Sequence, residues 1–155
     1  MRGEIVAIGD ELTTGVRLDT NSQWIAQQLG DLGVDVLYHT AVGDELQPMQ
    51  AVLPAAAGRA HGTSCAGGLD PTADDLTRDA LAACAGVQLV QDDDVLAHIR
   101  SIYSRRRRPM PDRNIVPAMF PAGSQVIPNP HGKAPGIDIN IDVPLPRGDS
   151  QPDRF

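Results

Sequence analysis

One stretch, residues 67–78, combines residue types that can bind phosphate groups and metal ions. Gly67 and Gly68 allow the main chain to approach a bound group closely or to adopt positive φ. A capped helix start follows, with Asp74 and Asp75 in the first turn, where the helix dipole favours negative charge. Free N–H groups at such a start can bind phosphate, and adjacent carboxylates can bind bridging Mg²⁺. The alternative is a surface helix whose carboxylates only complement the dipole.

Two further loops place carboxylates beside glycine. Residues 9–15 contain Asp10 and Glu11, and residues 43–45 contain Asp44, which should cap the helix that follows. Each of the three loops follows a predicted strand, and ligands of parallel α/β sheets bind at the carboxyl ends of the strands. Three loops of similar chemistry at one sheet edge predict a binding site there.

Alternating strands and helices must position these loops. Residues 4–9 and 34–42 are apolar and β-branched, which predicts the first two strands. The helix between them should begin at Asp19 and bury a face that includes Trp24. This alternation predicts an α/β fold with a mostly parallel sheet and helices on both faces.

The third strand is the weakest element of this pattern. Residues 61–66 contain no Val, Ile or Leu, so a strand there has little to bury. The preceding helix should run towards residue 59, with a kink or an early end caused by Pro54. The next helix is predicted over residues 72–85 with Thr72 as its N-cap.

The remainder of the chain predicts shorter elements. Residues 92–108 form a helix with an acidic start and a basic end, which matches the helix dipole. No aromatic residues interleave its arginine run, so a nucleic-acid patch is the less favoured interpretation. Residues 115–120 predict a short helix, residues 124–127 and 137–143 predict strands, and residues 144–155 predict a loose tail.

Composition narrows the functional classes. The net charge of −7 argues against non-specific nucleic-acid binding and suits a site of carboxylates and metal. Aromatic residues make up only 3% of the chain, so the core must rest on aliphatic side chains. Cys65 and Cys84 are expected to be reduced thiols. No signal peptide or membrane-spanning stretch is recognisable, which predicts a cytoplasmic protein.

Several motifs occur in an order known from one family: residues 8–15, 19–21, 42–44, 67–77, 107–110 and 129–136. Together they resemble the N-terminal domain of CinA-like proteins, which has the molybdopterin-binding MoaB/MogA-like fold. The resemblance implies a three-layer α/β domain over residues 1–143 that binds a nucleotide or a pterin. Some CinA-like domains hydrolyse ADP-ribose-type diphosphates with a divalent metal.

The resemblance also implies site residues. Two carboxylates would be catalytic, namely Asp74 and Asp75. The ligand-binding set would be Gly9, Asp10, Glu11, Asp19, Asn21, Gly67, Gly68 and Thr77. The metal-binding set would be Asp44, Asp74 and Asp75, holding Mg²⁺ or another divalent cation against a diphosphate.

Some positions depart from the family pattern. Asp70 stands where the family has glycine, which places negative charge at a phosphate site, and Lys133 replaces a threonine. The family's strand before the glycine pair is strongly apolar, unlike residues 61–66. The sequence contains no counterpart of the family's C-terminal amidase domain, so amidase activity is not expected.

Three hypotheses follow. The chain is a module that binds a small nucleotide or pterin, a metal-dependent pyrophosphatase, or a truncated remnant. The remnant would either have no function of its own or need a partner chain to complete its sheet. The expected partner is a small molecule, and a homo-oligomer is a further possibility. Neither nucleic acid nor a membrane is expected as a partner.

Overall fold

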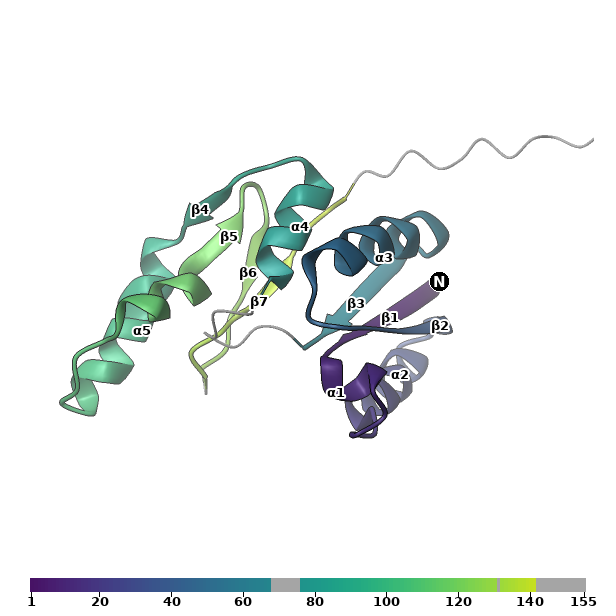
Figure 1. The fold of residues 1–155 in the computed structure, drawn as a ribbon, viewed down its shortest axis with the longest axis horizontal. Coiled ribbons are helices and arrows are strands. Elements are labelled where there is room, and N and C mark those ends of the chain that lie inside the picture. Colours follow the sequence, from purple (N-terminus) through teal and green to yellow (C-terminus); the bar gives the residue numbers. More distant parts are fainter. Residues whose placement is uncertain (68–75, 131, 142–155) are drawn as a thin grey trace, which may run out of the picture.

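The computed structural model describes residues 1–67, 76–130 and 132–141. Its central element is a parallel sheet in the order β2-β1-β3 (Figure 1). The three strands are β1 (Arg2–Ile8), β2 (Asp35–Val42) and β3 (Gly62–Ala66). The predicted α/β fold with a mostly parallel sheet is confirmed in this part of the chain.

Helices cover both faces of this sheet (Figure 1). On one side lie α1 (Asp10–Thr13) and α2 (Thr20–Asp31). On the other side lies α3 (Leu46–Arg59), against which α4 (Thr77–Ala85) packs. None of the helices in the described segments is long and apolar enough to span a membrane.

In the second half of the chain, α5 and η1 extend away from the sheet, whereas the segment after β6 returns towards it (Figure 1). Its elements are β4 (Leu89–Gln91), α5 (Asp93–Arg105), the 3₁₀ helix η1 (Asp112–Ala118), β5 (Met119–Pro121), β6 (Gln125–Ile127) and β7 (Gly136–Asp138). Antiparallel pairing joins β4 to β5 and β6 to β7. The helix α5 packs on η1 through Leu96 and Ile99, which are buried with Ala118 in a small second core.

The main core lies between the sheet and the pair α3 and α4. Its buried members are aliphatic, as the low aromatic content predicts: Val6, Ile8, Val42, Met49, Leu53, Ala56, Ala80 and Leu81. Residues 137, 139 and 141 also pack against this cluster, so the segment after β6 belongs to the same unit as the sheet.

A charged side chain is buried on the core side of the sheet. Glu4 of β1 is fully buried and accepts hydrogen bonds from Nε of Arg59 and Oγ1 of Thr40, both at 2.7 Å. The Arg59 guanidinium also lies 4.4 Å from the centroid of the Tyr38 ring. These contacts satisfy the carboxylate, and the hydrogen bond from Arg59 holds the pKa of Glu4 below its ordinary value of 4.5.

The weak third strand forms despite its sequence. Each residue from Gly62 to Ala66 has a partner in β1, so main-chain pairing supplies what side-chain burial does not. Its side chains are only half-buried, apart from exposed Gly62. Among the described strands β3 pairs with β1 alone, and its other edge is unpaired.

Several local predictions are wrong in detail. Residues 10–13 form the short helix α1 rather than a loop. The helix after the glycine pair begins at Thr77 rather than near residue 72, with Leu76 at its N-cap position, and Thr72 itself lies outside the described residues. The helix α3 runs to Arg59 as predicted, so only the early end expected as one of two effects of Pro54 is wrong. Trp24 is 62% exposed rather than buried, because α2 buries only Ser22 fully.

Other local predictions are confirmed. Asp19 and Asp92 cap α2 and α5, each accepting a main-chain N–H three residues on at 2.9 Å. Gly86 ends α4 with φ of 66°. The glycine-pair residues 68–75 and the predicted tail of residues 144–155 lie outside the described residues.

Candidate functional site

A glycine follows each strand of the parallel sheet, and a Cβ at any of these positions would make a close contact. Gly67, after β3, has φ of 110°, and a Cβ there would collide with the carbonyl oxygen of Ile8. At Gly43, after β2, a Cβ would lie 2.6 Å from Oδ1 of Asp10. The three strand ends therefore meet closely at one edge, as the sequence predicts.

Two of the predicted site carboxylates tie the ends of β1 and β2 together. The N–H of Asp44 donates to Oδ1 of Asp10 at 3.0 Å, and the N–H of Asp10 donates to Oδ2 of Asp44 at 3.2 Å. Asp44 was predicted to cap α3, and this is wrong because the capping position belongs to Glu45, which makes no side-chain cap. The second oxygen of each carboxylate takes no part in these two hydrogen bonds.

The other predicted ligand-binding residues in the described segments have differing roles. Glu11 is exposed in α1, with Oε1 4.0 Å from Nη1 of Arg17. Asp19 uses its carboxylate to cap α2, and Asn21 is exposed in the first turn of that helix. Buried Gly9 leads from β1 into α1, where a Cβ would lie 2.9 Å from Oε2 of Glu11.

Thr77 and Arg78 begin α4 as buried residues. Thr77 is 2% exposed, with Oγ1 3.9 Å from Sδ of Met49. Arg78, only 1% exposed, places a cation inside the protein directly after the segment that the sequence singles out. Gly68, Asp74 and Asp75 lie outside the described residues, so their part of the prediction remains a prediction.

The described residues alone do not form a metal site. Within residues 1–67, 76–130 and 132–141, no three His, Cys, Asp or Glu side chains gather closely enough to hold a metal ion. Asp10 and Asp44 offer two carboxylate oxygens, and oxygen ligands of this kind suit Mg²⁺. A divalent cation would need further ligands from water or from a bound phosphate.

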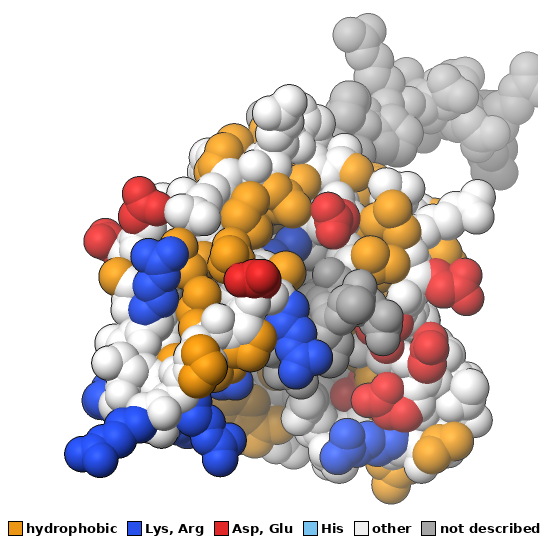
Figure 2. All heavy atoms as spheres, turned by 60° about the vertical axis from the view of Figure 1, so that its left-hand side comes forward, with side chains coloured by type: hydrophobic (Ala, Val, Ile, Leu, Met, Phe, Trp, Pro, Cys, Tyr) orange, Lys and Arg blue, Asp and Glu red, His pale blue; other side chains and the backbone are white. Residues whose placement is uncertain are grey.

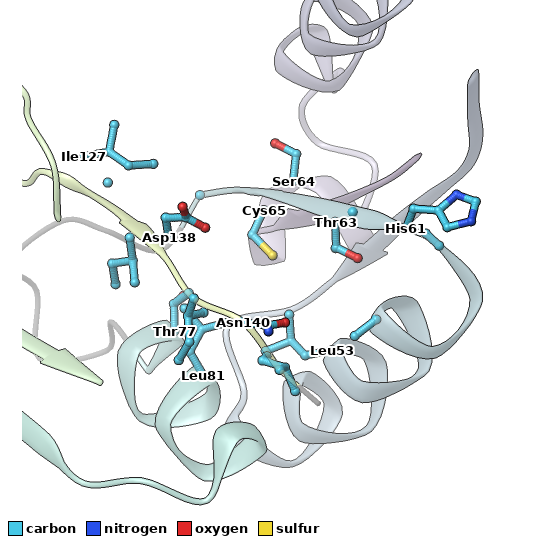
Figure 3. A pocket seen from close by; sticks show the side chains of 18 residues that line it. Leu53, His61, Thr63, Ser64, Cys65, Thr77, Leu81, Ile127, Asp138 and Asn140 are labelled. Carbon is cyan, nitrogen blue, oxygen red and sulfur yellow. The ribbon is translucent and has the colours of Figure 1, made fainter. Parts of the chain in front are cut away.

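A cavity opens beside the unpaired edge of β3. Its volume is about 470 Å³, within the range of small-molecule sites. Residues 136–141 form the opposite wall, and α3 and α4 contribute Leu53 and Leu81 (Figure 3). Gly67 and Thr77 line the same cavity, so it extends to the strand-end edge. We call this cavity the slot.

The slot contains polar groups that the sequence analysis did not select. Thr63, Cys65 and Asn140 point into it, whereas the side chain of Ser64, a residue that also lines the slot, points away from those of Thr63 and Cys65 (Figure 3). Oγ1 of Thr63 is buried and has no hydrogen-bond partner among the described residues. The signal for these residues was the unusual polarity of residues 61–66, which sequence reasoning treats as a defect of the strand.

Cys65 is a poor nucleophile in this environment. Burial in the slot wall raises the pKa of the thiol to about 11, with a smaller contribution from the charge of Glu4. We expect alkylation of Cys65 by iodoacetamide at pH 8 to be at least about tenfold slower than that of a free thiol of ordinary pKa, because the thiolate reacts. Peptide mapping of the alkylated protein measures this rate, and labelling as fast as that of glutathione would contradict the described burial.

The family to which the chain belongs follows from comparison with known proteins. The family model described as a probable molybdopterin binding domain matches residues 4–144. The chain therefore belongs to this family, and the resemblance to CinA-like proteins is confirmed. A competence-damage inducible protein of Lysinibacillus sphaericus is 41% identical to this chain over 140 residues. The match covers 90% of this chain and 33% of that protein. A CinA-like protein of Koribacter versatilis is 43% identical over 136 residues, covering 88% and 33%.

Solved structures agree with this assignment. The CinA structure from Thermoplasma acidophilum has a TM-score of 0.80 at 28% identity, covering 88% of this chain and 79% of that one. MoaB, a molybdopterin biosynthesis enzyme from Thermus thermophilus, has a TM-score of 0.52 at 25% identity, covering 70% and 67%. The chain spans about a third of the length of the curated relatives it matches.

Proposed function

We propose that this domain binds a small molecule that joins a nucleoside or pterin ring to a diphosphate. The slot supports this proposal most directly, because a cavity of about 470 Å³ reaches from the core to Gly67 at the strand ends. The ring would enter the slot, between aliphatic side chains and the polar groups of Thr63 and Asn140. The diphosphate would lie towards Gly67, which lines the slot at the strand ends.

The charge at the strand ends determines what else must bind. Asp10, Glu11 and Asp44 would repel a diphosphate, whose charge has the same sign. A divalent cation between these carboxylates and the phosphates would offset this repulsion and supply a Lewis acid when bound. Ligand affinity should therefore depend on Mg²⁺, and it should weaken when the Asp44 carboxylate is neutralised without loss of its hydrogen bond.

Calorimetric titration of the whole chain with ADP-ribose, with and without Mg²⁺, tests the proposal. We expect binding that requires Mg²⁺ and weakens about tenfold, or roughly 1.4 kcal/mol, in Asp44→Asn. Analysis of the same mixture for AMP distinguishes a binding module, which forms none, from a pyrophosphatase. No heat of binding with either ADP-ribose or a soluble pterin would contradict the proposed function.

Thr63→Val tests whether the slot is part of the site. Valine matches threonine in shape and removes a buried hydroxyl with no described partner, so the fold should be as stable or slightly more stable. ADP-ribose affinity should fall several-fold if the hydroxyl contacts the ring. Ser64→Ala is the matched control, because Ser64 points the other way, and an equal effect of both variants would argue against a ring in the slot.

A further inference from the structure

Positive charge is concentrated in one part of this acidic chain. Residues 95–137 contain seven basic residues and one acidic residue, Asp112, although the whole chain carries a net charge of −7. The basic residues are Arg100, Arg105, Arg106, Arg107, Arg108, Arg113 and Lys133. We call this group the arginine lobe.

Within the described residues, no ion pair neutralises a charge of the arginine lobe, and only its part at the end of α5 faces the helix dipole. All six of its arginines are exposed. Among the described residues the ion pairs are Arg17 with Glu11 and Arg59 with Glu4, neither of which is in the lobe. Uncompensated like charges repel one another, so an anionic partner would stabilise this arrangement.

The one lysine fixes a loop to the lobe. Nζ of Lys133 donates to the Tyr103 hydroxyl at 2.9 Å and lies 4.9 Å from the centroid of that ring. The Tyr103 hydroxyl in turn donates to Oδ1 of Asn114 at 2.9 Å. These contacts hold α5, η1 and the loop before β7 together, so the lobe is a structured surface.

The lobe and the strand-end site lie in different parts of the molecule. In Figure 1, α5 projects at one end, well separated from α1 and the ends of β1 and β2. Figure 2 shows Lys and Arg side chains gathered at its lower left, whereas Asp and Glu side chains predominate at its right. One copy of the chain therefore presents two separate surfaces of opposite charge.

Among the described residues, the exposed groups of the strand-end site supply little positive charge for an anionic ligand. Its exposed or half-buried charged groups are acidic, namely Asp10, Glu11, Asp44 and Glu45. Arg17 is the nearby exception in the described segments, and its guanidinium already faces Glu11 at 4.0 Å. We call these four carboxylates the acidic rim. Metal ions can supply part of the missing positive charge, and guanidinium groups can supply more.

We propose that the arginine lobe of a second copy docks on the acidic rim and contributes guanidinium groups to the ligand site. This inference rests on the proposed function for the identity of the ligand, but the docking itself requires no ligand. Guanidinium groups bind both carboxylates and phosphates in bidentate geometry, so the lobe suits the rim and a diphosphate bound there. The contact is head-to-tail and generates rings or chains of copies.

A nucleic acid is a less suitable partner for the arginine lobe than the acidic rim of a second copy. The chain's exposed aromatic side chains in the described segments are Trp24 and Tyr38, which lie outside the lobe, so no base-stacking platform is present there. The Tyr103 ring is covered by Lys133. Binding of a random-sequence duplex that competes with self-association would overturn the assignment of the partner.

Sedimentation velocity of the whole chain without ligand tests the docking. Self-association should be present at about 0.01 M salt and lost at about 1 M, where the Debye length falls from roughly 30 to 3 Å. The variant R106E/R108E should weaken association at least about tenfold, and so should E11K/E45K. An equimolar mixture of the two variants should associate again, because each then meets a surface of opposite charge. The control Arg2→Glu, an exposed arginine outside the lobe, should associate like the wild type.

The outcomes separate this inference from the proposed function. A wild type that stays monomeric at low salt, or a mixture that fails to recover association, would overturn the docking. In the ligand arm, inorganic pyrophosphate with Mg²⁺ should bind the variant mixture more tightly than R106E/R108E alone. Equal pyrophosphate affinity in R106E/R108E and wild type would remove the lobe from the site. Association without binding of any diphosphate would support the docking and reject the proposed function.

Discussion

Replacing Gly67 with alanine is expected to destabilise the domain by about 3 kcal/mol or more, a large part of the roughly 5–15 kcal/mol that stabilises a typical domain. Two causes act together. The backbone at Gly67 has φ of 110°, which side chains rarely adopt, and the new Cβ would collide with the carbonyl oxygen of Ile8. The carbonyl belongs to the central strand, so it cannot move without disturbing the sheet. Urea denaturation at pH 7 measures the change.

Gly86→Ala is the matched control for this prediction. Gly86 also has positive φ, 66°, but a Cβ there meets no atom within 4 Å. The loss of stability in Gly86→Ala should be limited to the backbone strain of about 1–2 kcal/mol. Equal losses in both variants would show that β3 does not approach Ile8 as described.

Replacing Glu4 with glutamine is expected to destabilise the domain by about 2 kcal/mol at pH 7. The change keeps the shape of the side chain but removes the charge that pairs with Arg59. Breaking a fully buried pair costs roughly 3–5 kcal/mol, and the loss should be smaller here because the Arg59 side chain is 42% exposed and stays hydrated. Glu4→Asp is unsuitable as a control because its shorter carboxylate would not reach Arg59. Asp35→Asn, which neutralises a carboxylate at the exposed start of β2, serves instead.

The same pair predicts how stability depends on pH. The pKa of Glu4 is lowered in the folded state by the hydrogen bond from Arg59, so unfolded Glu4 binds protons more tightly. Its contribution is therefore complete above the unfolded pKa, near 4.5, and is lost as the pH falls through the folded pKa. The gap in unfolding free energy between wild type and Glu4→Gln should be constant from pH 8 to about 5 and should narrow below that. A gap that widened on acidification would contradict the described pair.

Sequence patterns predicted all three strands of the sheet, but β3 was expected only from the alternation of strands and helices. Apolar runs identified β1 and β2, and capping residues identified the starts of α2 and α5, since these signals are local. Burial patterns within residues 61–66 argued against a strand, yet β3 forms because β1 offers a complete row of main-chain partners. Pairing between distant segments leaves no signature in the residues of one strand.

The candidate site shows the same division. The strand and helix pattern correctly predicted that the ends of β1, β2 and β3 lie at one edge of a parallel sheet. The exchange of hydrogen bonds between Asp10 and Asp44 could not be predicted, because the two residues are distant in sequence and Asp44 also fits the local pattern of a helix cap. The slot was missed for a related reason. Its walls come from β3 and residues 136–141, which no sequence motif connects.

A thermal melt of the whole chain with and without ADP-ribose plus Mg²⁺ tests the central claim, which is that the strand ends and the slot form one ligand site. Ligand at about 100 times its Kd should add roughly 2.7 kcal/mol to the unfolding free energy and raise Tm by several degrees. Mg²⁺ alone or ADP-ribose alone should give a smaller shift, and Thr63→Val should reduce the shift whereas Ser64→Ala should not. A Tm that is unchanged by millimolar ADP-ribose with Mg²⁺, in a chain that melts cooperatively, would contradict the account.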